Sequence, residues 1–150
     1  MAGFNSTITG LIRPHMKAED VTQRYHDSWN KRDADALVGA FIEGGTYRSP
    51  DTPPEGVSGQ DFAAFVKGVW TVFPDLSVEV IEAGEIRAGV VAHEWIVRGT
   101  NSGPGADDKP PSGRSVTLRG ASIFHLEGDK IRSEEVYFDR KGLDKQLGLV

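Results

Sequence analysis

The stretch "RSVTLRGASIFHLEGDKIRSEEVYF", residues 114–138, decides the fold because it holds two strand-like segments joined by one short turn. Residues 114–127 and 130–138 are both rich in the β-branched and aromatic side chains that strands favour. Gly128 and Asp129 lie between them, and this pair of residue types is typical of a tight hairpin. We therefore expect a long antiparallel pair of strands here.

Further strands are expected on the N-terminal side of this hairpin. Residues 76–83 and 89–100 have the same enrichment, and "TYRS", residues 46–49, has the character of a short strand that Pro50 stops. The segment "NSGPGADDKPPSG", residues 101–113, interrupts the pattern, and irregular loops of this length are often functional. The second half of the chain is thus predicted to be an antiparallel meander.

Apolar residues recur at helical spacing in the first half of the chain. The pattern starts at Glu19, continues from an N-cap at Asp33 as far as Gly44, and resumes at Ser58. A short tail helix follows Asp139, which we interpret as its N-cap. Helices that precede a meander predict an α+β domain. We expect a cone-shaped, curved antiparallel or mixed sheet, with three N-terminal helices over its concave face and a short C-terminal helix.

Size and charge narrow the class of protein. The chain has 150 residues, which suits one domain over residues 17–150 with residues 1–16 as an N-terminal arm. The formal net charge of −5 disfavours nucleic acid as a partner, since phosphate binding needs a basic surface. There is no cysteine, which excludes disulfides and thiolate chemistry. Neither a signal-peptide pattern nor a long apolar segment is present, so we expect a soluble cytoplasmic protein with no membrane partner.

Several motifs follow one another between Lys17 and Gly148, including "YHDSWNKRDADAL", "FPDL", "PPSGR", "GDKI" and "FDRKGLDKQLG". Together they resemble the SnoaL-like polyketide cyclase family, within the nuclear transport factor 2 and ketosteroid isomerase superfamily. The resemblance implies a cone-shaped α+β barrel that usually forms a homodimer. For the true cyclases of the family it implies closure of a polyketide ring by intramolecular aldol condensation, without a metal ion or an organic cofactor.

The resemblance also identifies a position where this sequence departs from the family's cyclases. In those enzymes a catalytic aspartate on the last strand lies three residues before the tail-helix aspartate, and a histidine lies across from it. The corresponding positions here are Val136 and Ser122. A valine can neither abstract a proton next to a carbonyl nor return one to an oxyanion. The usual acid of the cyclase reaction is therefore missing.

Glu134 is the leading candidate for a replacement acid or base. If a three-residue loop over residues 128–130 joins the strands, Glu127 faces Ile131 and Phe124 faces Glu134. The same count pairs Ser122 with Val136 and Gly120 with Phe138. Glu134 would then share the cavity face with apolar side chains, which raise the pKa of a carboxyl group towards neutrality. The alternative is a bulged strand that leaves Glu134 solvated near the rim.

Glu94, in "VAHEWIVRGT", is the second candidate acid or base. In one orientation of the strand Glu94 and Ile96 face the cavity, and Glu94 forms a coupled pair of carboxyl groups with Glu134. If the register slips by one residue, His93 and Trp95 face the cavity instead, with His93 as the base. We take the first orientation as our prediction.

A polar pair and an aromatic set are expected to line the cavity. The Tyr47 hydroxyl either donates a hydrogen bond to a developing oxyanion or lies at the surface while the ring packs under the helices. Aromatic residues at helical spacing usually belong to the core, but Trp29 and Phe65 are expected to contact a flat ligand. The predicted ligand-binding residues are Tyr47, Ser49, Trp29, Phe65, Ile96, Ser122, Phe124, Val136 and Phe138.

Besides a purely dimeric scaffold with a collapsed cavity, two hypotheses for the function follow from these residues. The first is a cofactor-independent enzyme of the cyclase, isomerase or hydrolase kind that acts on a hydrophobic, oxygenated small molecule, with Glu134 or Glu94 as acid or base. The second is a non-catalytic small-molecule-binding protein of the same fold, which Val136 favours. The expected partners are a hydrophobic small molecule and a second copy of the chain, and no metal or cofactor is expected.

Overall fold

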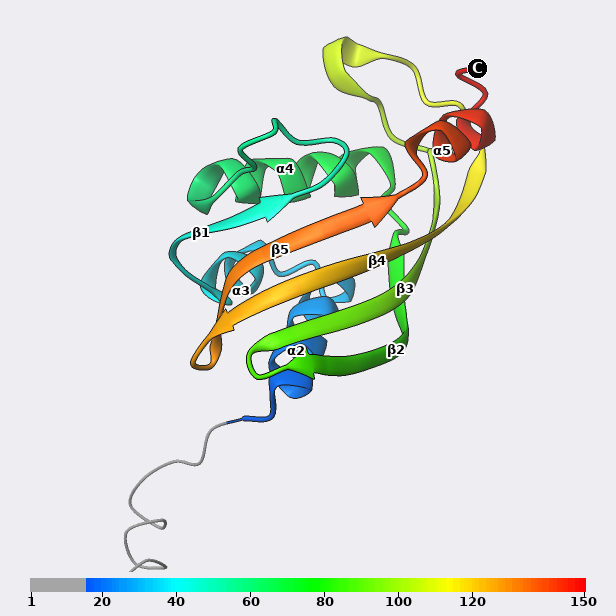
Figure 1. Ribbon diagram of the computed structural model, residues 1–150. Coiled ribbons are helices and arrows are strands. Elements are labelled where there is room, and N and C mark those ends of the chain that lie inside the picture. Colours follow the sequence, from blue (N-terminus) through cyan, green and yellow to red (C-terminus); the bar gives the residue numbers. More distant parts are fainter. Residues whose placement is uncertain (1–15) are drawn as a thin grey trace, which may run out of the picture.

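The structure, a computed structural model, describes residues 16–150 (Figure 1). The arm expected over residues 1–16 therefore lies outside the described residues, except for Met16. In chain order the elements are α2 (Ala18–Asn30), α3 (Ala34–Gly39), β1 (Phe41–Arg48), α4 (Gly59–Val72), β2 (Ser77–Arg87), β3 (Val90–Thr100), a short 3-10 helix (Ala106–Asp108), β4 (Ser115–Glu127), β5 (Lys130–Phe138) and α5 (Arg140–Leu147). None of the helices in this part of the chain has the length and apolar character needed to cross a membrane.

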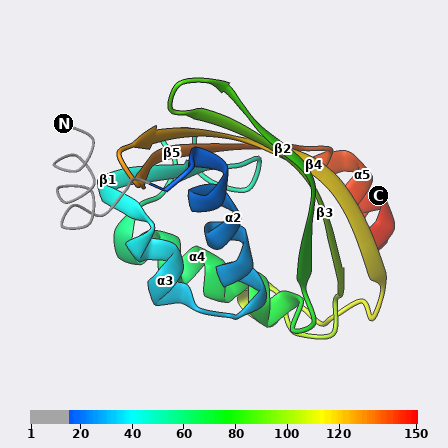
Figure 2. The same ribbon diagram turned by 90° about the horizontal axis from the view of Figure 1, so that it is seen from below.

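The strands form a five-stranded sheet in the order β1-β5-β4-β3-β2. β1 runs parallel to β5 and the other neighbouring strands are antiparallel, so the sheet is mixed. It stays open, with β1 and β2 at its edges. Figure 2 shows that the sheet curves around α2, α3 and α4, which lie on its concave side. The predicted α+β architecture, with helices over a curved mixed sheet and a short C-terminal helix, is confirmed.

Amphipathic patterning explains why α2 and α4 pack on the concave face of the sheet. Val21, Tyr25 and Trp29 of α2 are spaced four residues apart, and each side chain is at most 7% exposed. Phe62 and Val66 form the corresponding stripe on α4. All five residues belong to one core with the inner face of the sheet. Burial of each aliphatic or phenylalanine side chain contributes roughly 1.5–3 kcal/mol.

α3 is shorter than the sequence pattern predicted. Asp33 is its N-cap as expected, because its carboxylate accepts a backbone N–H of the first turn at 2.9 Å. The helix ends at Gly39 instead of Gly44, and Phe41 begins β1. Phe41 pairs with Ile131 of β5, so strand pairing between distant segments overrides the helical spacing here.

Asp139 is the N-cap of α5, as predicted. Its carboxylate accepts the backbone N–H of Gly142 at 2.9 Å, an interaction that typically contributes about 1 kcal/mol. Gly148 ends the helix in the left-handed conformation that favours glycine, with φ of 77°. Asp139 therefore has a structural role, and any acid on this strand has to lie before it.

The hairpin between β4 and β5 has a tighter turn than predicted, followed by a bulge. Glu127 pairs with Lys130, so the loop holds two residues instead of three. A register shift after Ile131 then leaves Arg132 as an extra residue in β5. This extra residue restores the predicted register further along the strands. The observed pairs include Phe124 with Glu134, Ser122 with Val136 and Gly120 with Phe138.

Candidate active site

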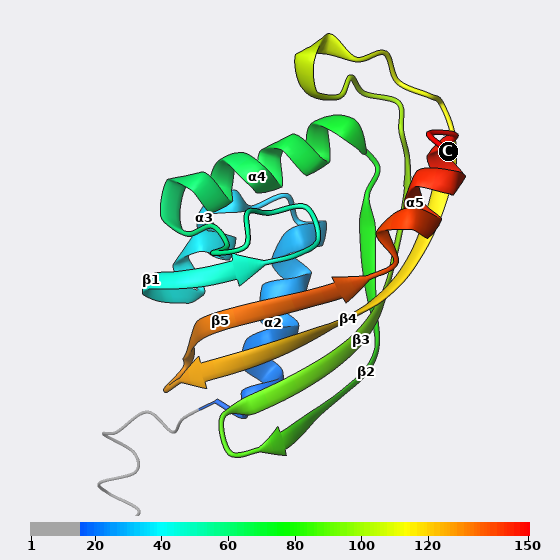
Figure 3. The ribbon, with the colours of Figure 1, turned by 45° about the horizontal axis from the view of Figure 1, so that its top comes forward.

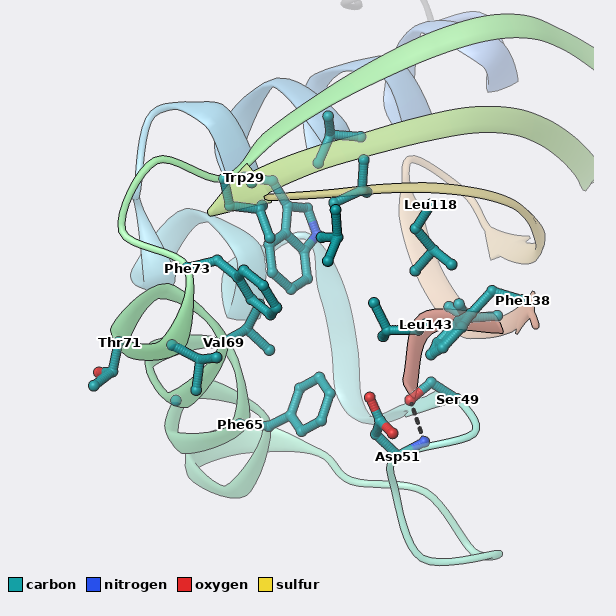
Figure 4. A pocket seen from close by; sticks show the side chains of 18 of the residues that line it. Trp29, Ser49, Asp51, Phe65, Val69, Thr71, Phe73, Leu118, Phe138 and Leu143 are labelled. Carbon is teal, nitrogen blue, oxygen red and sulfur yellow. Dashed lines mark hydrogen bonds between the residues drawn. The ribbon is translucent and has the colours of Figure 1, made fainter. Parts of the chain in front are cut away.

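A pocket of about 710 Å³ lies between the helices and the concave face of the sheet. In Figure 4, Phe65 and Phe73 line one side of it, while Leu118, Phe138 and Leu143 line the other. Most of the wall is apolar, and both volume and lining are typical of a site for a small organic molecule. The geometry therefore provides room for a ligand with a ring system.

The long loop between β3 and β4 forms part of the pocket wall through residues 104–106. The Gly103 N–H donates to the carbonyl of Val72, at the end of α4, at 3.3 Å. The Asn101 side-chain amide donates to the carbonyls of Val72 and Gly103 at 3.3 and 3.0 Å. Figures 1 and 3 show the loop at the end of the sheet where α5 lies. These bonds attach the loop to α4 at that end of the pocket.

Glu134 lies in the pocket wall and is held by a chain of hydrogen bonds. Its side chain is 2% exposed. The Ser122 hydroxyl donates to Oε2 of Glu134 at 2.7 Å, and the Trp95 indole N–H donates to the Ser122 hydroxyl at 2.9 Å. These two bonds link β3, β4 and β5 across the inner face of the sheet. They fix the orientation of the carboxyl group, as an acid/base catalyst requires.

Burial raises the pKa of Glu134 to about 7, although the nearby hydroxyls of Tyr25 and Ser122 act to lower it; the charge of Glu135 makes only a small upward contribution to this net value. Near neutral pH the carboxyl group is therefore populated in both its acid and its base form. Within residues 16–150, Oε1 of Glu134 and the hydroxyl of Tyr25 are both buried without a hydrogen-bond partner. Ser122 thus occupies Oε2, while Oε1 is buried without a hydrogen bond in this part of the chain and has the Tyr25 phenol as an electrostatic neighbour.

Tyr47 places a phenol next to this carboxyl group. It is the direct neighbour of Glu134 across the β1–β5 pairing and lines the pocket. Burial, and then the charge of Glu134, raise the pKa values of both Tyr47 and Tyr25 well above the usual range of a tyrosine. Both phenols therefore keep their protons near neutral pH. A buried phenol that lines a pocket can donate a hydrogen bond to a developing oxyanion.

The prediction that Glu94 and Ile96 face the cavity is wrong. His93 and Trp95 of β3 are buried on the inner face, at 1% and 5% exposed. The Glu94 side chain is 51% exposed, with Arg119 at 4.0 Å, and Ile96 shares its face of the strand and does not line the pocket. The orientation that buries Trp95 prevails because its indole N–H finds Ser122 as a partner, whereas a carboxylate is costly to bury.

The other predicted ligand-binding residues divide between the pocket and the core. Phe124 is fully buried and packs edge-on against Tyr25, His26 and His93, so it belongs to the core behind the pocket wall. Ser49 lines the pocket, and its hydroxyl accepts the backbone N–H of Asp51 at 3.1 Å (Figure 4). The predicted residues that line the pocket are Trp29, Tyr47, Ser49, Phe65, Ser122, Glu134, Val136 and Phe138.

Sequence reasoning missed several polar residues of the pocket wall, among them His26 and Asp51. His26 is 4% exposed and its Nδ1 lies 3.0 Å from Nδ1 of His93. Its spacing of three residues from Trp29 puts it on the buried face of α2, which is the signal that was available. Asp51 accepts a hydrogen bond from Arg140 at 2.8 Å, and burial raises its pKa.

Comparison with known proteins identifies the family of this chain. The sequence model of the SnoaL-like polyketide cyclases matches residues 19–147. The chain belongs to the SnoaL-like polyketide cyclase family. Apart from Ala18, the first residue of α2, the match covers every helix and strand described above. A search of the curated proteins finds no significant match.

Solved structures show the same fold at low sequence identity. A suggested SnoaL-like polyketide cyclase from Jannaschia sp. CCS1 is 20% identical with a TM-score of 0.77, over 93% of this chain and 96% of that one. AclR of Streptomyces galilaeus, a suggested hydroxylase, is 20% identical with a TM-score of 0.75, over 89% and 85%. A protein of ketosteroid isomerase-like fold from Catenulispora acidiphila DSM 44928, solved with trimethylamine, is 17% identical with a TM-score of 0.69, over 87% and 93%. The SnoaL-like fold thus accompanies proteins with different suggested activities.

Proposed function

We propose that this SnoaL-like protein is a cofactor-independent acid/base enzyme whose substrate is a hydrophobic, oxygenated ring compound. The supporting observation is Glu134, a buried carboxyl group in an apolar pocket of about 710 Å³ with a pKa raised to about 7. Such a group takes and returns protons near neutral pH without a metal or an organic cofactor. The family and the fold support this class of reaction and leave the substrate open.

The proposed chemistry starts with proton abstraction from a carbon next to a carbonyl. The ionised Glu134 takes the proton, and the electron pair of the broken C–H bond moves onto the carbonyl oxygen. The Tyr47 hydroxyl donates a hydrogen bond to that oxyanion. Return of the proton from Glu134 to another carbon isomerises the substrate. Alternatively, attack of the enolate carbon on a second carbonyl of the same molecule closes a ring and moves the π electrons of that carbonyl onto its oxygen. Glu134 then returns its proton to this alkoxide, which gives a hydroxyl group and regenerates the carboxylate.

The proposed acid, Glu134, lies at a different point along β5 from Val136, the position to which the family resemblance assigned the catalytic acid. Val136 and Ser122 are cross-strand partners and both line the pocket. Glu134 lies two residues before Val136, on the same face of β5, which is a displacement of roughly 7 Å along the strand. A ligand that reacts at Glu134 is therefore placed further along β5, towards the hairpin, than one that reacts at the position of Val136.

Hydrogen exchange at the α-carbon tests the proposal without knowledge of the natural substrate. The protein is mixed with 2-tetralone, an enolisable bicyclic ketone, in deuterated buffer, and loss of the α-proton signals is followed by NMR. Wild-type protein is expected to accelerate exchange, and Glu134→Gln to lower the catalysed rate at least about 100-fold. Glu135→Gln, a change on the other face of β5, is the matched control. Full acceleration in Glu134→Gln would exclude Glu134 as the acid or base.

A binding protein without catalysis is the second candidate, and Val136 at the assigned acid position favours it. This alternative predicts that the wild-type protein binds bicyclic ketones but leaves their exchange rate at the value of the buffer. Binding is measured by calorimetry under the same conditions. Tight binding without accelerated exchange over a panel of enolisable ketones would replace the enzyme proposal with this one.

We also propose that the protein forms a homodimer through the outer face of the sheet. Tyr137 of β5 lies there and is 60% exposed, next to the half-buried Ala121 of β4. Light scattering is expected to give twice the chain mass for the wild type and the single mass for Tyr137→Glu. A monomeric wild type would contradict this proposal. The cytoplasmic location stays a prediction, to be checked by cell fractionation.

A further inference from the structure

Two buried histidines form a direct pair beside the pocket. His26 of α2 and His93 of β3 have their ring centroids 4.7 Å apart and their Nδ1 atoms 3.0 Å apart. Burial, and then the charge of His93, lower the pKa of His26 to about 3, and burial lowers the pKa of His93 to about 4. Both rings are therefore neutral near pH 7. A neutral imidazole has one N–H donor and one acceptor nitrogen, so one Nδ1 donates to the other.

Thr22 decides the direction of this hydrogen bond. Its hydroxyl is hydrogen bonded to Nε2 of His93, and it also lies 3.1 Å from the carbonyl oxygen of Glu19. A carbonyl oxygen can only accept, whereas Nε2 of His93 can donate or accept, so both contacts are hydrogen bonds at once only if the single hydroxyl proton of Thr22 is directed to the Glu19 carbonyl. The hydroxyl oxygen therefore accepts from His93, and Nε2 of His93 carries the proton.

The state of His26 follows from that of His93. With its proton on Nε2, His93 has an unprotonated Nδ1, which accepts from the Nδ1–H of His26. His26 is then left with an unprotonated Nε2. His26 lines the pocket, and no hydrogen bond to its Nε2 occurs within residues 16–150. The ring thus has one acceptor atom available to a ligand.

We propose that the Thr22–His93–His26 chain holds His26 as a fixed hydrogen-bond acceptor in the pocket, and that it recognises a hydroxyl group on the ligand. The inference rests on the proposed function, because it concerns the ligand of the same pocket, and it narrows that ligand to a hydroxylated ring such as a phenol or an enol. A methyl ether or a second carbonyl at that point offers no donor and would leave Nε2 unsatisfied.

If the Thr22–His93–His26 hydrogen bonds ran in the opposite direction, the pocket would prefer the opposite kind of ligand group. If Thr22 donated to His93, then His93 would donate to His26 through Nδ1, and Nε2 of His26 would carry a proton. The pocket would then present a donor and prefer a carbonyl or an ether. The tautomer of His26 therefore decides between the two, and it can be measured on the wild-type protein.

Long-range ¹H–¹⁵N correlation spectra of the full ¹⁵N-labelled chain at neutral pH report which ring nitrogen carries the proton. The His26 signals are assigned by comparison with His26→Phe and His125→Gln. We expect the Nδ1–H form for His26 and the Nε2–H form for His93. An Nε2–H form for His26, or a charged ring, would overturn the inference.

Ligand binding gives a second, independent test. Wild-type protein is expected to bind 2-naphthol at least about tenfold more tightly than 2-methoxynaphthalene, which has the same ring system without the donor. The preference should disappear in His26→Phe and weaken in Thr22→Val, which keeps the shape of the side chain. His125→Gln, on the outer face of the sheet, should leave it unchanged. Equal wild-type affinities, including no binding of either compound, or a preserved preference in His26→Phe, would overturn the proposal.

The two proposals fail in distinguishable ways. Glu134→Gln is expected to lose catalysed α-proton exchange while keeping its preference for 2-naphthol. If wild-type protein catalyses exchange but shows no preference for 2-naphthol over 2-methoxynaphthalene, only the proposed role of His26 is overturned. A preserved preference in a wild type that catalyses no exchange would overturn the enzyme proposal alone.

Discussion

Glu134 and Glu135 are neighbours on β5, yet they lie in opposite environments. Glu134 faces the pocket, where burial raises its pKa to about 7 and its main partner is the neutral Ser122 hydroxyl. Glu135 faces outwards and accepts hydrogen bonds from the guanidinium group of Arg48, in an ion pair that remains partly exposed. Two identical side chains therefore have different chemistry because the strand alternates its faces.

The same contrast occurs on β3. His93 and Trp95 face inwards and make hydrogen bonds to neutral partners, whereas Glu94 faces outwards near Arg119. The inner face of the sheet thus combines neutral polar groups with an apolar surrounding, and the outer face carries solvated charge pairs. The face of the sheet, more than the residue type, therefore determines whether an acid or base is buried beside neutral partners or paired with a charge at the surface.

The largest expected effect is on the pH dependence of stability, to which the titratable groups of the inner face contribute strongly. His26 and His93 are neutral in the folded protein down to pH values of about 3 and 4, while an unfolded histidine gains its proton near 6.5. Below that pH the unfolded chain binds more protons, so stability falls as the pH drops. The combined contribution of the two histidines to the free energy of unfolding should fall by roughly 5 kcal/mol between pH 7 and 4.5.

Glu134 acts in the other direction in this range. Its folded pKa is about 7 and its unfolded value 4.5, so its contribution is fully present below 4.5 and is lost as the pH rises to 7. Over the same pH range, acidification therefore raises the contribution of Glu134 to the free energy of unfolding by roughly 3 kcal/mol. The free energy of unfolding of the wild type should as a result fall by only about 2–3 kcal/mol. Urea unfolding at several pH values should give a steeper acid loss for Glu134→Gln and an unchanged one for the outer-face variant Ser133→Ala. Equal slopes in wild type and Glu134→Gln would contradict this account.

Gly120 should show the next largest effect, because it lies under the indole of Trp95 on the inner face. A Cβ there would collide with the Trp95 ring and would lie 2.7 Å from the carbonyl oxygen of Tyr137. Gly120→Ala should destabilise the fold by about 3 kcal/mol. Gly84→Ala in β2, where a Cβ meets nothing within 4 Å, should change stability by less than about 0.5 kcal/mol. Similar losses for both variants in thermal unfolding would remove the distinction.

How much the sequence could predict differs between β5 and β3. The turn at Gly128 and the alternation after it predicted the bounds of β5 to the residue, and the inward position of Glu134. The loop length was wrong, but the bulge at Arg132 compensated for it. Bulges leave no clear mark in a single sequence, so this agreement at Glu134 depended on two deviations that cancel.

β3 could not be oriented from its sequence because both of its faces carry apolar residues. One face has Val91 and Trp95, and the other has Val90 and Ile96. The choice depends on Ser122, a partner 27 positions away in the chain, which satisfies the buried indole N–H. The His26–His93 pair was missed for the same reason, since only the packing of α2 on β3 brings the two rings together.

Ser122 allows a sharper test of the inner face. Ser122→Ala removes the donor to Glu134 and leaves the buried Trp95 indole N–H without its partner, which should destabilise the protein by about 2 kcal/mol. The pKa of Glu134 should rise, because this hydrogen bond lowers it. The pH profile of α-proton exchange should shift upwards in Ser122→Ala and stay in place in the outer-face variant Ser133→Ala. An unchanged pH profile in Ser122→Ala would show that Ser122 does not affect the pKa of Glu134.

The smallest effect is expected on the outer face. Glu135→Gln removes the ion pair with Arg48, and partly exposed pairs typically contribute at most about 1 kcal/mol. Stability should fall by no more than that in chemical unfolding. The maximal rate of α-proton exchange should be retained, with its pH profile shifted slightly downwards because the charge of Glu135 contributes to the raised pKa of Glu134. A loss of exchange as large as that of Glu134→Gln would show that the two faces are chemically connected, and the comparison would fail.

The bulge at Arg132 has a consequence for how such proteins diversify. If Arg132 entered the regular ladder opposite His125, every later residue of β5 would move to the other face, and Glu135 would replace Glu134 inside the pocket. Deletion of Arg132 would instead remove the bulge and keep Glu134 where it is. A one-residue change of register in this hairpin can therefore exchange the pocket's acid without any substitution. Comparisons of SnoaL-like proteins need to align this turn by structure before any residue of the last strand is assigned a role.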